Sequence, residues 1–210
     1  AAHTMCIREA GQEYPYTLIT DSLHNIYNMV TVIAALRQLG YDHGTIARRM
    51  AEVKIPASRL SEEEISGVKV IMQMSKDKNA LACSRNFDYI RSKPGKKELL
   101  LMMNCLGVAK NWSENPSWMY DTDFEFLNSD DVTCLVCAGP RAYDYQLRLL
   151  LAGIPRQKIR LAEDEFAALE LLPLTPGDDV YLLYGVDGTP LAFRVREKLK
   201  EKLLAKEGAQ

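Results

Sequence analysis

The chain of 210 residues is 47% hydrophobic and 26% charged, with a formal net charge of -2. This composition is typical of a globular protein with a buried core, and the slight negative charge argues against nucleic acid or an anionic lipid surface as the main partner. No apolar run approaches the roughly 20 residues of a membrane-spanning helix, and the N-terminal segment lacks a signal-peptide pattern. We therefore expect a cytoplasmic protein without a membrane span.

The N-terminal part of the chain is predicted to be helical. Apolar residues recur at helical spacing over residues 23–39, with a polar N-cap before them and Gly40 as C-cap. A second, short helix is predicted over residues 45–53. A polar segment follows, and the break between this part and the remainder falls near residues 56–67.

From residue 68 onward, short apolar runs alternate with helical segments. The pattern predicts strands at residues 68–74, 98–104, 132–139, 158–162 and 179–185. It predicts helices at residues 79–90, 118–127, 140–152, 163–172 and 191–206. Such alternation indicates an α/β fold, with a Rossmann-like, mostly parallel sheet covered by helices on both faces. We place the domains at residues 1–62 and 63–210.

Two cysteines form a C-x-x-C pair, Cys134 and Cys137, which could serve as a redox or zinc site. They lie inside VTCLVCAG, which is typical of a buried strand, where positions three apart face opposite sides. A second C-x-x-C is missing, and the three histidines all lie in the first quarter of the chain. Zinc usually takes four ligands, so we favour structural cysteines and predict no metal site.

Neither of the glycine-rich phosphate-binding motifs, G-x-x-x-x-G-K-[ST] and G-x-G-x-x-G, occurs in the chain. The segment of residues 94–97, Pro-Gly-Lys-Lys, precedes a strand, whereas a phosphate site needs the N-terminus of a helix. We therefore expect that this chain alone is not a complete ATP-driven enzyme.

Five segments, in the same order, resemble parts of Mur-type ligases. HNIYNMVTVIAALRQLG is similar to the asparagine-rich helix that closes the central domain of these enzymes. MSKDKNALACSRNFDYI resembles the K-N-P-x-G-x-N segment of the MurT-like branch, with matches at Lys78 and Asn79. ELLLMMN, ending at Asn104, resembles the strand of that branch that ends in Asn-Asp.

The most specific segment is SWMYDTDFEFL, which resembles the S-W-x-W-D-x-D-F-E block of the MurT-like branch. Its matching residues are Ser117, Trp118, Asp121, Asp123, Phe124 and Glu125. CAGPRAYDYQLRLLLAGI resembles the S-G-x-R-x-x-D-x-x-L-R-x-x-Y-A-G helix of the same branch, including Arg141, Asp144 and Arg148. The resemblance runs from about residue 23 to about residue 194, so the chain is similar to the C-terminal region of MurT-like proteins.

MurT-like proteins form the ligase subunit of lipid II isoglutaminyl synthase. The resemblance implies that ATP activates the D-glutamate α-carboxylate of lipid II, and that a GatD-like glutamine amidotransferase partner supplies the ammonia that amidates it. It also implies that residues 1–62 are a helical remnant of a Mur ligase central domain and residues 63–210 a Mur ligase C-terminal domain. ATP and magnesium are expected only for a full-length ligase, and no cofactor for this chain alone.

The resemblance also assigns roles to individual residues. Asp121 would complete the Cys/His pair of the amidotransferase, although a helix-capping or solvated carboxylate is the alternative. The residues that contact the lipid II-type substrate would be Lys78, Asn79, Asn104 and Arg141. The partner would contact Trp118, Asp123 and Glu125, with a core role as the alternative for Trp118. Arg141 and Arg148 share one helical face and could clamp an acidic group together or pair with Asp144.

The chain departs from the family pattern in the loop from Cys105 to Pro116, where the family carries several acids and this chain has Asn115 in place of an expected Asp. The phosphate loop, the zinc-ribbon cysteines and the metal-binding centre of the family lie upstream of the matched segments. Two interpretations therefore stay open. The chain is either part of a ligase that needs its upstream ATP-binding domain, or a diverged, non-catalytic binding or scaffold module.

Overall fold

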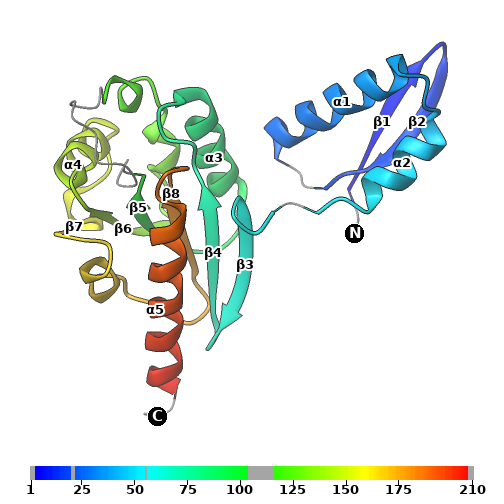
Figure 1. Cartoon of the computed structure of the whole chain (residues 1–210). Helices are drawn as coiled ribbons and strands as arrows, with labels where there is room; N and C mark the ends of the chain where they lie inside the picture. The colour runs from blue at the N-terminus through cyan, green and yellow to red at the C-terminus, as the bar shows by residue number, and fades with distance from the viewer. Residues whose placement is uncertain (1–2, 20–21, 55, 104–115, 208–210) are drawn as a thin grey trace. The chain divides into compact units, whose positions relative to one another are not determined.

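The computed structural model describes residues 3–19, 22–54, 56–103 and 116–207, and it divides into two compact units, residues 1–55 and 56–210 (Figure 1). The division falls after residue 55, whereas the sequence pattern places it after residue 62. The reason is β3 (Leu60–Ile65), a strand that the polar sequence SRLSEEEISG does not indicate and that belongs to the sheet of the second unit.

The first unit consists of an antiparallel hairpin and two helices. The hairpin is formed by β1 (Thr4–Glu9) and β2 (Gln12–Thr17), and the helices are α1 (Leu23–Gln38) and α2 (His43–Ala51). Both helices were predicted, but the hairpin was not. Its turn residues, Ala10 and Gly11, both have positive φ angles (49° and 81°), as a two-residue turn of type I′ requires.

A small core holds the first unit together. It combines Tyr16 of β2 with Met29 and Ile33 of α1 and with Ile46 and Met50 of α2. The helical spacing of these apolar residues is the pattern that predicts both helices from the sequence.

The second unit is built on a six-stranded sheet with the order β3-β4-β8-β5-β6-β7 in the described residues. Its further strands are β4 (Val68–Met74), β5 (Lys97–Met102), β6 (Val132–Ala138), β7 (Ile159–Ala162) and β8 (Asp179–Tyr184). The pairs β4–β8, β8–β5, β5–β6 and β6–β7 are parallel, and only the edge strand β3 runs antiparallel to its neighbour. The predicted mostly parallel sheet is confirmed.

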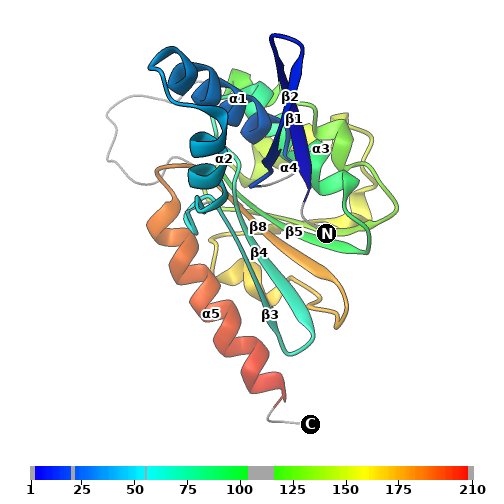
Figure 2. The same ribbon diagram turned by 90° about the vertical axis from the view of Figure 1, so that its right-hand side faces the viewer.

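Helices cover both faces of this sheet, as Figures 1 and 2 show. On one face, α3 (Ala80–Ser92) and α4 (Ala142–Leu151) enclose a first core that includes Ile71, Leu99 and Leu135. On the other face, α5 (Thr189–Glu207) encloses a second core that includes Val70, Leu100 and Val136. Because neighbouring residues of a strand point to opposite faces, buried parallel strands read as continuous apolar runs.

The C-x-x-C pair follows this alternation. Cys134 lies in the second core and Cys137 in the first, so the two side chains are on opposite faces of the sheet. Burial raises the pKa of Cys134 to about 11 and that of Cys137 to about 12. The arrangement is that of two structural cysteines and not of a paired ligand set.

Two predicted helices are wrong. Residues 117–127 form two separate 3₁₀ turns, Ser117–Met119 and Phe124–Leu127. The Thr122 hydroxyl donates to the carbonyl oxygen of Trp118 and the amide of Asp123 donates to Oγ of Ser84 in α3, and these bonds replace a continuous helical ladder. In the region 163–172 only Ala167–Glu170 is a 3₁₀ turn. There, the Asp164 carboxylate accepts hydrogen bonds from the two amides that start the turn, and Pro173 follows soon after it.

Two further short elements complete the second unit: a 3₁₀ turn at Arg156–Lys158, directly before β7, and the loop that leads into β8. The buried carboxylate of Glu98, in β5, accepts hydrogen bonds from the backbone amides of Leu174 and Thr175 in that loop, at 2.9 and 3.1 Å. Backbone amides thereby supply hydrogen bonds to a buried carboxylate at the edge of the sheet where the parallel strands begin. No helix in the described part of the chain is long and apolar enough to cross a bilayer.

Candidate functional site

The loops that follow the parallel strands meet at one edge of the sheet in the second unit. Residues 75–79 follow β4, residues 185–188 follow β8, and residues 139–141 follow β6. In open α/β sheets, ligands bind outside this carboxyl edge, which is where the sequence places the candidate residues. The loop that follows β5 contains Asn104 and most of the divergent segment 105–116, and residues 104–115 lie outside the described residues.

The loop between β4 and α3 has an uncommon backbone. Lys76 and Lys78 both adopt left-handed conformations, with φ angles of 44° and 69°. For residues other than glycine such angles are rare and are concentrated at functional loops. Asn79 then starts α3, and its Oδ1 accepts a hydrogen bond from the amide of Ala82 at 3.0 Å. The N-cap orients Asn79 and fixes Lys78 directly before the helix.

This loop contacts the loop that follows β8. The amide of Val186 donates a hydrogen bond to Oδ1 of Asp77 at 3.3 Å, and the Asp77 carboxylate lies so close to Gly185 that any side chain at residue 185 would overlap it. Beside this contact, Nζ of Lys78 lies 3.9 Å from Oδ2 of Asp187. The structure thus places Lys78 between the ends of two neighbouring parallel strands, in an ion pair with Asp187.

Arg141 lies at the start of α4, at the carboxyl edge of β6. Its Nη1 donates a hydrogen bond to Oδ2 of Asp144, 3.1 Å away, one helical turn along. Arg148, the second arginine of the same predicted face, is buried and does not share this contact. The two arginines therefore do not form a joint clamp. Of the two, Arg141 is the one that pairs with Asp144.

Arg148 instead holds the segment Ser117–Leu127, which we call the acidic block, against α4. Its Nε donates to the carbonyl oxygen of Met119 at 3.1 Å, and its Nη2 donates to that of Thr122 at 2.8 Å. Nη2 also contacts both carboxylate oxygens of Glu125, at 2.9 and 2.8 Å. One buried guanidinium thereby fixes three points of the block, a use of the planar donor fork that lysine could not reproduce.

Further contacts fix the acidic block from the side of α3. The amide of Asp123 donates to Oγ of Ser84 at 2.8 Å, and the hydroxyl of Thr122 donates to the carbonyl oxygen of Trp118 at 2.7 Å. Phe124 is fully buried and meets Phe87 of α3 edge to face. Trp118 is half-buried against the first core, so part of its ring has the core role that was its alternative.

The acids of the block differ in their surroundings. Asp121 and Asp123 have exposed side chains, and Asp121 lies between the two 3₁₀ turns, in a position without helix-capping geometry of its own. Glu125 is ion-paired, and the hydrogen bond from Arg148 lowers the pKa of its carboxyl group below the ordinary value. The block therefore presents a well-held backbone from which Asp121 projects toward solvent.

The predicted site residues form two groups in the structure. Lys78 and Asn79 lie together at the end of β4, and Arg141 lies at the end of β6; the acidic block forms the second group, between α3 and α4. Sequence reasoning missed the bond between Arg148 and the block. The spacing of the two arginines was visible, but the partner of Arg148 lies 23 residues earlier and no local pattern indicates it.

The described residues contain no group of three or more His, Cys, Asp or Glu side chains that could hold a metal ion. In the first unit, His43 joins a hydrogen-bonded chain, with Nδ1 at 2.6 Å from the Tyr16 hydroxyl and Nε2 at 2.6 Å from Oε2 of Glu9. Tyr14 stacks on the same ring. These contacts tie α2 to the hairpin.

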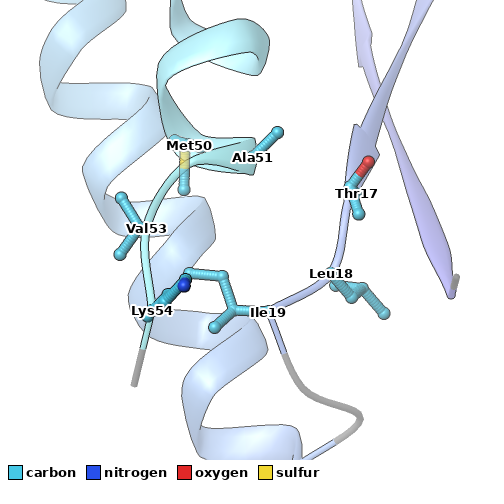
Figure 3. A pocket seen from close by; sticks show the side chains of 7 residues that line it. All are labelled: Thr17, Leu18, Ile19, Met50, Ala51, Val53 and Lys54. Atoms are coloured by element: carbon cyan, nitrogen blue, oxygen red, sulfur yellow. The ribbon is translucent and has the colours of Figure 1, made fainter. Parts of the chain in front are cut away.

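A pocket of about 330 Å³ lies in the first unit, between the ends of β2 and α2 (Figure 3). Aliphatic side chains form most of its lining, together with Thr17 and Lys54. Binding sites usually combine such an apolar lining with several converging polar groups. This pocket lacks that combination, so the chemistry of the chain is better sought at the sheet edge.

Comparison with known proteins bears on this arrangement directly. The sequence model of the family described as MurT ligase C-terminal matches residues 77–185, more than half of the chain. The chain belongs to this family. The matched region begins in the loop after β4, ends directly after β8, and includes the acidic block and α4.

Two curated relatives carry the same family name. The chain is 26% identical over 151 residues to the MurT subunit of lipid II isoglutaminyl synthase (glutamine-hydrolyzing) from Streptococcus pneumoniae, covering 71% of the chain and 32% of that protein. It is 25% identical over 130 residues to the MurT subunit from Staphylococcus aureus, covering 62% of the chain and 29% of that protein. The chain thus spans about a third of the length of these relatives.

Solved structures with the same fold include Mur ligases. MurF from Acinetobacter baumannii superposes with a TM-score of 0.66 at 16% identity, covering 94% of the chain and 42% of that protein. MurF from Thermotoga maritima, solved in complex with ADP, superposes with a TM-score of 0.62 at 17% identity, covering 97% and 44%. These similarities show the Mur ligase-like fold of this MurT-type chain.

Proposed function

We propose that this chain is the C-terminal portion of a MurT-like ligase subunit that amidates the D-glutamate of lipid II, using ammonia from a GatD-like glutamine amidotransferase. The observation that carries the proposal is the acidic block. It lies inside the family match, Arg148 and Ser84 hold its backbone, and Asp121 projects from it with an exposed carboxylate. The relatives' printed name, a subunit of a glutamine-hydrolysing synthase, supports an ammonia-supplying partner.

In this proposal Asp121 faces the amidotransferase and accepts a hydrogen bond from the histidine of its Cys/His pair. A carboxylate in this role orients the imidazole and stabilises its charged form while the cysteine attacks glutamine. Trp118 and Asp123 flank Asp121 as contacts to the partner. Glu125 supports the same surface through its pair with Arg148.

The substrate side of the proposal uses the carboxyl edge of the sheet. Lys78, Asn79 and Arg141 supply cationic and amide groups at the ends of β4 and β6, and Asn104 belongs to the same set by its place after β5. Such groups suit a substrate that carries carboxylates and phosphates. ATP and magnesium would be held by a full-length ligase, because the described residues offer neither a phosphate loop nor a cluster of metal ligands.

The proposal is tested by glutamine hydrolysis of the amidotransferase subunit mixed with the ligase subunit. We expect Asp121→Asn to lower the rate by roughly 10²- to 10⁴-fold, as loss of the orienting acid does in related triads. Asp130 is an exposed aspartate nine residues further along the chain, so Asp130→Asn serves as the matched control and should leave the rate unchanged. Absence of any stimulation by the wild-type chain would refute the partnership, whereas full activity of Asp121→Asn would refute only the role of this residue.

A further inference from the structure

Helix α4 is apolar on two opposite faces. Its inner face is buried in the first core through Ala142, Tyr145 and Leu149. Its outer face carries Tyr143, Leu147, Leu150 and Leu151, whose exposed fractions are 76%, 49%, 40% and 63%. Positions i, i+4, i+7 and i+8 lie on one side of a helix, so these four side chains form a continuous stripe. We call them the outer stripe.

The other long helices of the second unit differ from α4. The solvent side of α3 carries Arg85 and Arg91, which both form an ion pair with Asp88. On α5, Lys198 and Glu201 pair in the same way. Exposed apolar side chains occur there only singly, such as Leu204 with an exposed fraction of 50%. A surface helix normally presents polar residues opposite its core face, so the outer stripe is built to be covered.

The outer stripe is joined to the acidic block by Arg148. This residue projects from α4, between the inner face and the outer stripe, and bonds to the carbonyl oxygens of Met119 and Thr122 and to Glu125. The helix with the exposed apolar side is therefore the same element that positions the block with Asp121. The block that Arg148 joins to α4 also exposes the carboxylates of Asp121 and Asp123, which give it negative charge.

We propose that the outer stripe is the surface on which the amidotransferase subunit docks, through an apolar patch with a basic rim. The inference rests on the proposed function, since Asp121 can serve a partner only if the partner lies against the block and the helix that holds it. An apolar centre with a charged rim is the usual anatomy of a specific interface. A second copy of this chain would bring the same exposed acids of the block, and repulsion between like charges disfavours that pairing.

The test measures binding of the amidotransferase subunit to the ligase subunit by calorimetry. Leu147→Glu with Leu151→Glu should raise the Kd at least about tenfold, because charges would replace two side chains at the centre of the contact. Leu204→Glu on α5 is the control, since its exposed fraction matches that of Leu147, and it should bind like the wild type. Tyr143→Ala removes the most exposed side chain of the outer stripe. Its Kd gives a second measure of the contact that is independent of the double variant.

The outcomes separate the two proposals. If wild-type protein binds and both the double variant and Tyr143→Ala bind equally well, the docking surface is wrong while the partnership stands. Light scattering shows whether the wild type is a homodimer that the stripe variants convert to monomers. If they do so and leave the Kd for the amidotransferase unchanged, the outer stripe is a self-association surface and the inference is overturned. If the wild-type chain fails to bind the amidotransferase, the proposed function fails and the inference with it. Asp121→Asn should raise the Kd much less than the double variant while it loses hydrolysis, and this difference separates docking from chemistry.

Discussion

Arg148 shows how one buried side chain can hold a whole segment in place. Its guanidinium bonds to two backbone carbonyl oxygens and one carboxylate of the acidic block, and its exposed fraction is only 6%. Satisfied buried polar groups of this kind specify a single arrangement, whereas an unsatisfied one is costly. The position of Asp121 thus depends on a residue that is itself buried.

We predict that Arg148→Met lowers the free energy of unfolding by about 1–3 kcal/mol, because the carbonyl groups of Met119 and Thr122 lose their donor. Urea unfolding followed by circular dichroism measures this loss. Arg141→Met is the matched control on the same helix, and loss of its more exposed pair should cost less than about 1 kcal/mol. Equal losses in the two variants would contradict the structural role of Arg148.

Glu125 makes the same contact sensitive to pH. Its folded-state pKa is lowered by Arg148, so its ionised form stabilises the fold above the ordinary carboxyl pKa, and this contribution is lost as the pH falls through the lowered value. We predict that wild type is more stable than Glu125→Gln at pH 7 and that the difference shrinks toward pH 3. Urea unfolding at several pH values measures it, and a difference that stays constant with pH would argue against the ion pair.

The cysteines of the buried strands supply a direct check on the sheet. Burial raises the pKa of Cys134 and Cys137, and of Cys83 in α3, well above that of a free thiol, whereas Cys6 in β1 is exposed. In a Cys105→Ser background, we predict that a thiol reagent at pH 8 modifies Cys6 rapidly and the other three thiols only on unfolding. Rapid reaction of two or more thiols in the native protein would contradict the placement of β6 and α3.

Elements with a strong local pattern were predictable from the sequence. The parallel strands β4, β5, β6 and β8 are buried on both faces and read as unbroken apolar runs, and the helices α1 to α5 show clear periodicity or caps. The edge strand β3 was missed because its sequence is polar and does not show a strand pattern. Its pairing with β4 outweighs this weak local preference. The 3₁₀ turns of the acidic block were missed because bonds to Ser84 and Arg148, far along the chain, hold them. The turn at Ala167–Glu170 was missed because the Asp164 carboxylate accepts from the two amides that start it.

The candidate site was predictable to a similar degree. The sheet edge follows from topology alone, and Lys78, Asn79 and Arg141 do lie there. The left-handed backbone at Lys78 and the bond between Arg148 and Glu125 could not be read from the sequence, because both depend on tertiary packing.

At the scale of the whole molecule, the division after residue 55 has a measurable consequence. Both cores of the second unit draw only on residues between 60 and 203, so we predict that residues 56–210 alone unfold in one cooperative transition and stay monomeric. A shorter chain, residues 66–210, lacks β3 and exposes the backbone edge of β4, so it should aggregate or melt at lower temperature. Differential scanning calorimetry and light scattering compare the two. A disordered 56–210 fragment would contradict the division.

The contact between Asp77 and Gly185 has a consequence for how this chain can change during evolution. Residue 185 cannot gain even a methyl group while the carboxylate of residue 77 stays in place, and residue 77 reaches the following amide only because residue 185 has no side chain. Although 108 positions separate them, these two residues constrain each other. A family member that has lost the acid at residue 77 is released from the need for glycine at residue 185. The two loops at the carboxyl edge are thus expected to vary together.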